Sequence, residues 1–173
     1  MSKIVCIFGT GQRTGVNDPV YAMAYALGYT LAQAGLTVAN GGYGGTMEAG
    51  AQGARAAGGK VIGVTCEAFG RSGPNPYITE EIMTSTLYER IRTLVELGDG
   101  FIVLPGGTGT LLEMAMVWEF KHKGFLPPHK PIWVLGDRWR RVVQAVVEQD
   151  RESRYHIQTV DSVETIRSLV QAL

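Results

Sequence analysis

The chain has few of the residues that mark metal-binding, disulfide-linked or membrane proteins. It contains two cysteines and three histidines in 173 residues, and their scattered positions fit neither a disulfide framework nor a set of spaced metal ligands. No apolar run approaches the ~20 residues that a membrane helix needs. We therefore expect no metal and no membrane partner. Because Met1–Phe8 lacks the layout of a secretory signal, we also expect a cytoplasmic location.

An excess of charge of one sign is also missing. Sixteen basic residues balance sixteen acidic ones, so the formal net charge at pH 7 is zero. A balanced surface provides no basic field for a nucleic acid, and we expect no such partner. The sequence contains no Gly-Lys-Ser or Gly-Lys-Thr, which excludes a Walker A loop.

Short apolar runs alternate with helical patterns along the chain. Strands are expected at 3–8, 36–39, 60–65, 78–84, 101–104, 131–135 and 157–160. Helices are expected at 18–34, 46–57, 87–97, 111–123, 137–149 and 163–172. This alternation predicts an α/β fold, a doubly wound parallel sheet covered by helices on both faces. The length and the lack of a linker predict a single three-layer domain over residues 1–173.

Ligands of such sheets bind at the carboxyl ends of the strands. The loops expected there are 9–15, 40–45, 65–77 and 105–110. The first loop contains Gly9 and Thr10, a candidate phosphate-facing or sugar-facing turn, and resembles a dinucleotide fingerprint. However, Thr14 replaces the third glycine, and Asn40 stands where an acidic ribose contact would end the second strand. An NAD-dependent enzyme is therefore only a weakly supported alternative.

The run from Pro105 to Glu113, PGGTGTLLE, is the most informative stretch of the chain. It follows an apolar segment and opens into a helical pattern. A strand, a glycine turn and a helix start form an anion site, because the first N–H groups of a helix have no partner inside the helix. The second glycine-rich loop, 40–45, also favours close approach of a ligand.

Glu113 is not needed in a site that only holds phosphate, and two interpretations of it stay open. Thr110-Leu111-Leu112-Glu113 fits a capping box, in which Thr110 caps the helix and Glu113 reaches back to its N–H. Alternatively, the carboxylate faces a bound sugar and takes part in catalysis.

Arg90, on the expected helix 87–97, also has two interpretations. A lone arginine is usually solvated on an exposed face. Arg90 nevertheless lies one turn from Leu94, at the margin of the apolar face, whereas Arg92 falls on a different side. If one of the two arginines points into a cleft, the periodicity favours Arg90.

The segment Leu111–Phe120 is apolar in nearly every direction around its helix. The outer helices of a doubly wound fold normally keep a polar side. We therefore expect this helix to form a homodimer contact.

The complete PGGxGTxxE match, an arginine on the preceding helix and the glycine-rich loop after the second strand resemble the Lonely Guy family of phosphoribohydrolases, also labelled lysine decarboxylase-like. The similarity extends from Ile4 to about Leu135. It implies a Rossmann-like fold, a dimer or larger assembly, and no cofactor. It also implies hydrolysis of the N-glycosidic bond of a nucleoside 5′-monophosphate to a free base and ribose 5-phosphate, with cytokinin precursors as the best-known substrates.

The resemblance assigns roles to particular residues. The family's catalytic arginine corresponds to Arg90 and its motif glutamate to Glu113. The family's phosphate contacts correspond to Gly106, Gly107, Thr108, Gly109 and Thr110, with Gly42, Gly44 and Gly45 nearby. Pro105, Gly9 and Thr10 are further candidate phosphate or nucleotide contacts of the same strand-end loops. The chain departs from the cytokinin-active members at Ile91, Thr108 and Leu112, where lysine, tyrosine and a second glutamate are usual. The alternative is a non-catalytic nucleotide or molybdenum-cofactor carrier on the same fold.

Overall fold

The computed structural model describes residues 2–12, 15 and 17–173. The strands are β1 (Ile4–Phe8), β2 (Thr37–Asn40), β3 (Val61–Cys66), β4 (Glu80–Thr84), β5 (Gly100–Val103), β6 (Ile132–Leu135) and β7 (Gln158–Val160). The helices are α1 (Pro19–Gln33), α2 (Thr46–Ala56), α3 (Leu87–Leu97), α4 (Thr108–His122), α5 (Arg140–Gln149) and α6 (Val163–Leu169). A short 3₁₀ turn, η1 (Glu67–Phe69), follows β3.

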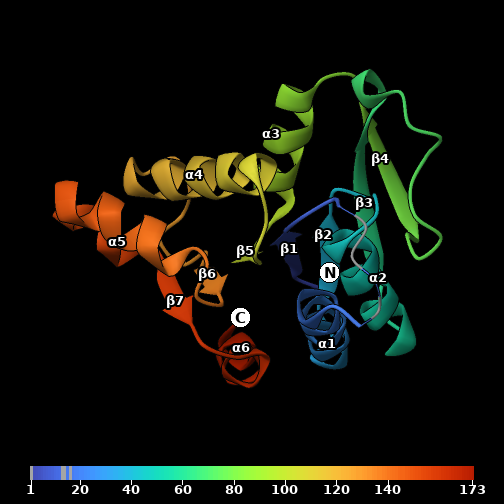
Figure 1. Ribbon diagram of the computed structural model, residues 1–173, viewed down its shortest axis with the longest axis horizontal. Coiled ribbons are helices and arrows are strands. Elements are labelled where there is room, and N and C mark those ends of the chain that lie inside the picture. The colour runs from blue at the N-terminus through green and yellow to red at the C-terminus, as the bar shows by residue number, and fades with distance from the viewer. Residues whose placement is uncertain (1, 13–14, 16) are drawn as a thin grey trace.

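All seven strands form one parallel sheet in the order β4-β3-β2-β1-β5-β6-β7 (Figure 1). The chain starts in the middle, runs outward to β4, and returns past β1 to build the other half. The predicted α/β, doubly wound, Rossmann-like fold is therefore confirmed. The direction of winding reverses between β1 and β5, which is where such sheets bind ligands.

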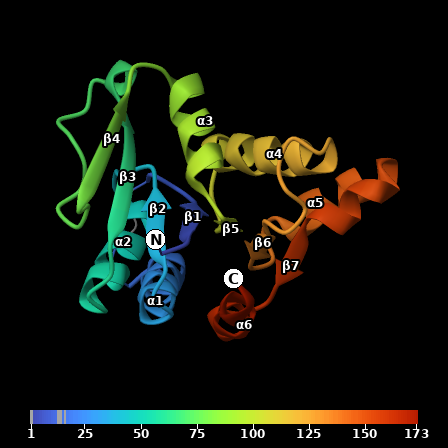
Figure 2. The same ribbon diagram turned by 180° about the vertical axis from the view of Figure 1, so that it is seen from behind.

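Helices cover both faces of the sheet, α1, α2 and α6 on one side and α3, α4 and α5 on the other (Figures 1 and 2). Successive strand residues point to opposite faces. Val5 and Ile7 of β1 thus pack into the core beneath α1, and Cys6 and Phe8 into the core beneath α3 and α4. Because both faces of the sheet are covered, the central strands are apolar throughout, as parallel sheets require.

The first helix begins as its sequence predicts, with Asp18 accepting a hydrogen bond from the Val20 N–H and Pro19 in the first turn. Helix α4 differs from the prediction, because it begins at Thr108 rather than at residue 111. Its N-cap is Gly107, which has no side chain to cap the helix. The capping-box interpretation is therefore wrong: Thr110 lies inside the first turn, buried against Gly106, and does not cap the helix.

Two kinds of feature are absent from the residues that the structure describes. No helix among them is long and apolar enough to cross a bilayer. No group of three or more His, Cys, Asp or Glu side chains gathers among them in a way that could hold a metal ion.

Candidate functional site

Four loops meet at the carboxyl ends of the central strands and enclose a cavity of about 310 Å³. They follow β1, β2, β3 and β5, the same strands whose loops the sequence predicted to gather there. Helices α3 and α4 complete the wall. The volume lies at the lower end of the range typical of small-molecule sites.

Arg90 reaches this cavity from α3 with only 6% of its surface exposed. Its Nε donates a hydrogen bond to the Val64 carbonyl oxygen over 2.8 Å, which fixes the guanidinium against the end of β3. Gly41 makes room for it, since a Cβ at that position would overlap the Arg90 Nη2. Arg92 lies on the solvent side of α3 and pairs with Glu96, so the structure places the two arginines as helical periodicity predicted.

Glu113 comes from the second turn of α4 and is also buried, with 8% of its surface exposed. Its Oε1 lies 3.5 Å from the Arg90 Nη1. Burial raises the pKa of the Glu113 carboxyl to about 7, because the loss of hydration outweighs the opposing effect of the Arg90 charge and hydrogen bond. This carboxyl can therefore take up and release a proton near neutral pH.

The start of α4 forms another part of the cavity wall. Gly107, Thr108, Gly109 and Thr110 line the cavity, together with Gly9 and Thr10 of the β1 loop. Because Gly107 provides no side-chain cap, the first N–H groups of α4 remain available to an anion in the cavity. The cavity thus joins the uncapped start of a helix to a buried carboxyl and guanidinium pair.

The other predicted contacts lie elsewhere. Pro105 and Gly106 line a neighbouring hollow of about 430 Å³, and Gly44 lines another of about 540 Å³. Gly42 and Gly45 line neither these hollows nor the cavity. Gly42 donates its N–H to the Asn40 Oδ1, and a Cβ on Gly45 would overlap the backbone of the β1 loop. Both glycines hold loops against each other, which their sequence could not distinguish from ligand contact.

Asn40, at the position where an NAD-binding sheet would carry an acid, serves the loop. Its Nδ2 donates to the Met47 carbonyl oxygen and its Oδ1 accepts from the Gly42 N–H. Both ends of the amide are therefore engaged, and Asn40 is not part of the cavity wall. Arg13 and Thr14, the last residues of the weak dinucleotide fingerprint, lie outside the described residues.

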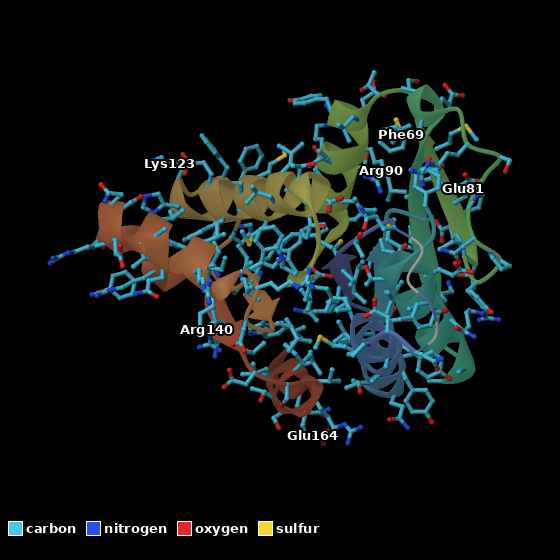
Figure 3. The ribbon with its side chains drawn as sticks, in the orientation of Figure 1. Phe69, Glu81, Arg90, Lys123, Arg140 and Glu164 are labelled. Carbon is cyan, nitrogen blue, oxygen red and sulfur yellow. The ribbon has the colours of Figure 1, made fainter. Side chains whose placement is uncertain are left out.

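Sequence reasoning missed an aromatic and cationic group on the same wall. Tyr43 and Phe69 stack at a tilt with their ring centroids 5.9 Å apart. Figure 3 shows Phe69 beside Arg90, between α3 and the end of β3, and the guanidinium carbon lies 5.7 Å from the ring centroid. Arg71 covers the Tyr43 ring at 4.6 Å. An aromatic residue inside a glycine-rich loop was the signal that could have indicated Tyr43, whereas Phe69 and Arg71 lie in an aperiodic loop.

The chain is similar to known proteins both in sequence and in structure. The sequence model described as "SLOG cluster4 family" matches residues 2–167. A cytokinin riboside 5′-monophosphate phosphoribohydrolase from Mycobacterium tuberculosis is 38% identical over 68% of this chain and 62% of its own length, so the match spans less than two thirds of that relative. A protein of the same name from Rhodococcoides fascians is 33% identical over 78% of this chain and 68% of its own length.

Among solved structures, the molybdenum cofactor binding protein of Rippkaea orientalis superposes with a TM-score of 0.82 at 24% identity, covering 99% of this chain and 97% of its own. At this identity, the likeness shows a common fold. The sequence relatives and this structural neighbour therefore bear names of two different kinds, one enzymatic and one for cofactor binding.

Proposed function

The chain belongs to the SLOG cluster4 family, as its resemblance to the Lonely Guy proteins predicted, and from this premise we propose that it hydrolyses the N-glycosidic bond of a nucleoside 5′-monophosphate. The products are a free base and ribose 5-phosphate. The observation that carries the proposal is the buried Arg90–Glu113 pair, 3.5 Å apart, in one cavity with the uncapped start of α4.

The chemistry follows from where charge develops. Breaking the C1′–N bond sends its electron pair to the base and leaves positive charge on the ribose, which a nearby carboxylate stabilises. Water then adds through its oxygen to C1′, and its proton passes to the base. With a pKa of about 7, Glu113 can accept that proton as a carboxylate and return it as an acid. Arg90, fixed by Val64, is the positioning group for this carboxyl.

A buried ion pair is itself an argument for function. Removing two charges from water is costly, and an apolar pair of similar size often stabilises a fold as well or better. Pairs of perturbed groups in a cavity are therefore candidates for catalysis. Helix α4 places Glu113 one turn beyond the N–H groups that would hold the 5′-phosphate, which brings the acid toward the sugar attached to that phosphate.

The direct test is release of free base from a panel of nucleoside monophosphates. We expect Glu113→Gln to reduce release at least about 100-fold, because removal of a catalytic acid or base costs roughly that factor. Arg90→Lys should have a similar effect, because lysine lacks the planar fork that contacts Val64 and Glu113 together. Glu119→Gln and Arg92→Lys, exposed positions on the same two helices, are matched controls that should keep full activity. Full activity in a folded Glu113→Gln protein contradicts the proposed role.

The second candidate is a carrier that binds a nucleotide or a pterin cofactor without turnover. Two cavity residues favour it, since Ile91 and Leu112 place apolar side chains on the wall where a catalytic site would use polar ones. The structural likeness to a molybdenum cofactor binding protein adds to it. Tight ligand binding with no base released from any nucleotide would support the carrier and contradict the hydrolase.

We also propose that α4 contributes to a homodimer. Its Met114, Val117 and Trp118 are buried in the chain's own core, while Leu111 and Leu112 remain exposed. Leu111 borders an apolar hollow of about 330 Å³ between α4 and α5. We expect Leu111→Asp to convert a dimer into a monomer in analytical ultracentrifugation, and Arg92→Lys, on the exposed side of α3, to leave it unchanged. A wild-type protein that sediments as a monomer at tens of micromolar contradicts the proposal.

A further inference from the structure

We propose that Arg71 selects the ligand by an edge with two adjacent hydrogen-bond acceptors, a ring carbonyl oxygen beside a ring nitrogen. Such an edge is present in 6-oxopurines and in oxidised 4-oxopterins, and is absent from adenine. For turnover, the inference rests on the function proposed above, because Arg71 lines the same cavity as Arg90 and Glu113.

The guanidinium of Arg71 contacts two aromatic rings of the protein but none of its hydrogen-bond acceptors among the described residues. It lies 4.6 Å from the Tyr43 ring centroid and 5.8 Å from that of Phe69. It makes no hydrogen bond or ion pair with any residue that the structure describes. A guanidinium stacked on a ring keeps its in-plane N–H donors free for a ligand, in a fork that matches two adjacent acceptors.

The loop that carries Arg71 is anchored to the platform it stacks on. Asn75 donates from its backbone N–H and its Nδ2 to the Gly42 carbonyl oxygen, over 2.7 and 3.1 Å. Its Nδ2 also donates to the Tyr43 carbonyl oxygen over 2.8 Å. These hydrogen bonds connect the β3–β4 loop, which carries Arg71, to the β2 loop, which carries Tyr43. The two side chains are therefore kept close to each other.

The neighbouring polar side chains are already engaged by the protein: the Tyr43 hydroxyl by Cys66, and the buried Arg90 guanidinium by Val64, Glu113 and the Met47 sulfur. The Tyr43 hydroxyl accepts from the Cys66 N–H and donates to the Cys66 carbonyl oxygen. Arg90 is engaged with Val64 and Glu113. The remaining wall near Arg71 and α3 is apolar, formed by Met47, Phe69, Leu87, Ile91 and Leu112. Among the described residues of this part of the cavity, Arg71 and Gln12 of the β1 loop are therefore the polar side chains that can still hydrogen-bond a ligand.

The balance of donors and acceptors decides the preferred edge. Glu113 provides the only carboxylate among the described residues that line the cavity, and it pairs with Arg90. Glu48 lines the adjoining hollow with Arg71, but not the cavity. An exocyclic amine such as that of adenine would face guanidinium donors, whereas the O6 and N7 of a 6-oxopurine accept from an arginine in the familiar bidentate pairing.

The order of the sheet gives the ligand its direction. A phosphate at the start of α4 lies over β5 and β1, while Tyr43 and Arg71 follow β2 and β3, further toward the β4 edge. Arg90 comes from α3, which packs on β1, β3 and β4, and Glu113 comes from α4, which packs on β1 and β5. A nucleotide lying across the strand ends thus places phosphate, ribose and base at α4, at the ion pair and at Arg71 in turn.

The test compares inosine and adenosine 5′-monophosphates, which differ in the group at position 6 of the base and in the proton that the 6-oxo form carries on N1. We expect the wild-type protein to bind the inosine nucleotide at least about tenfold more tightly by calorimetry, the value of one bidentate pair. Arg71→Ala and Arg71→Lys should both lose this preference, since lysine keeps the charge without the fork. Arg92→Ala is the matched arginine control and should keep it.

Each outcome bears on one idea. Equal or tighter binding of the adenosine nucleotide, or a preference that survives Arg71→Ala, overturns the inference. Base release that shows no such preference overturns it too, while leaving the proposed hydrolase intact. A preference that depends on Arg71, without base release, supports the inference and contradicts the hydrolase. Neopterin then separates the two possible ligands. If neopterin binds the wild type and Arg71→Ala weakens that binding, the ligand recognised by Arg71 is a pterin. If neopterin does not bind the wild type, the ligand is the 6-oxopurine.

Discussion

The two glycine-rich segments of this protein, 40–45 and 105–109, differ in how the protein packs around their glycines. In the first, an added Cβ at Gly41 would overlap the Arg90 guanidinium, and one at Gly45 would overlap the backbone of the β1 loop. In the second, the Cβ positions at Gly107 and Gly109 have no heavy atom within 4 Å. Gly106 is the exception in the second segment, because Thr110 fills its Cβ position. The packed glycines of the first segment thus lie against protein, whereas Gly107 and Gly109 face the cavity.

The difference teaches that a glycine-rich loop beside a site can serve it in two ways. The packed loop positions a side chain, because the missing Cβ of Gly41 lets Arg90 cross to Val64 and Glu113. The open loop leaves backbone N–H groups accessible to a ligand. The two loops meet at the Arg90–Glu113 pair, so substitutions there and in each loop separate their contributions.

The largest effect is expected where the loops meet. The folded protein holds the Glu113 proton with a pKa of about 7, against 4.5 for the group in its ordinary state. The folded state therefore binds this proton more tightly than the unfolded chain, and the free energy of unfolding falls as the pH rises from about 4.5 through 7. Relative to Glu113→Gln, the wild type should lose up to about 3 kcal/mol between pH 4 and pH 8.

Denaturant unfolding of both proteins across this pH range measures that difference. Parallel curves for the two proteins would show that Glu113 is already ionised at pH 5, and that the ion pair outweighs burial.

Gly41→Ala tests the packed loop. The new methyl group would displace the Arg90 guanidinium from Val64 and from Glu113. We expect base release to fall about 100-fold, since a misplacement of about 1 Å in a catalytic group has that consequence. The free energy of unfolding should fall by only about 1–3 kcal/mol, as for overpacking elsewhere. An active, stable Gly41→Ala protein would mean that Arg90 can accommodate the new methyl group without losing its contacts with Val64 and Glu113.

The sequence predicted the parts of this fold that depend on local pattern. The alternation of apolar runs gave the strands and helices, and the spacing of Arg90 from Leu94 separated it from the exposed Arg92. It failed at the start of α4, because Gly107 carries no side chain whose capping preference could be recognised. It also missed Arg71, whose partner Tyr43 comes from a loop 28 positions earlier, a contact that no periodicity encodes.

Gly109→Ala gives the smallest expected effect and tests the open loop alone. Gly109 lies in the first turn of α4 with free space at its Cβ, so alanine should stabilise the unliganded protein by roughly 0.5–1 kcal/mol through helix propensity. If a phosphate occupies that space, the same methyl group should weaken binding of a nucleoside monophosphate while leaving binding of the free base unchanged. A variant that gains stability and keeps full nucleotide affinity would mean that the ligand does not approach Gly109. The free space at the Cβ positions of Gly107 and Gly109 would then be unoccupied surface and not part of a ligand-binding site.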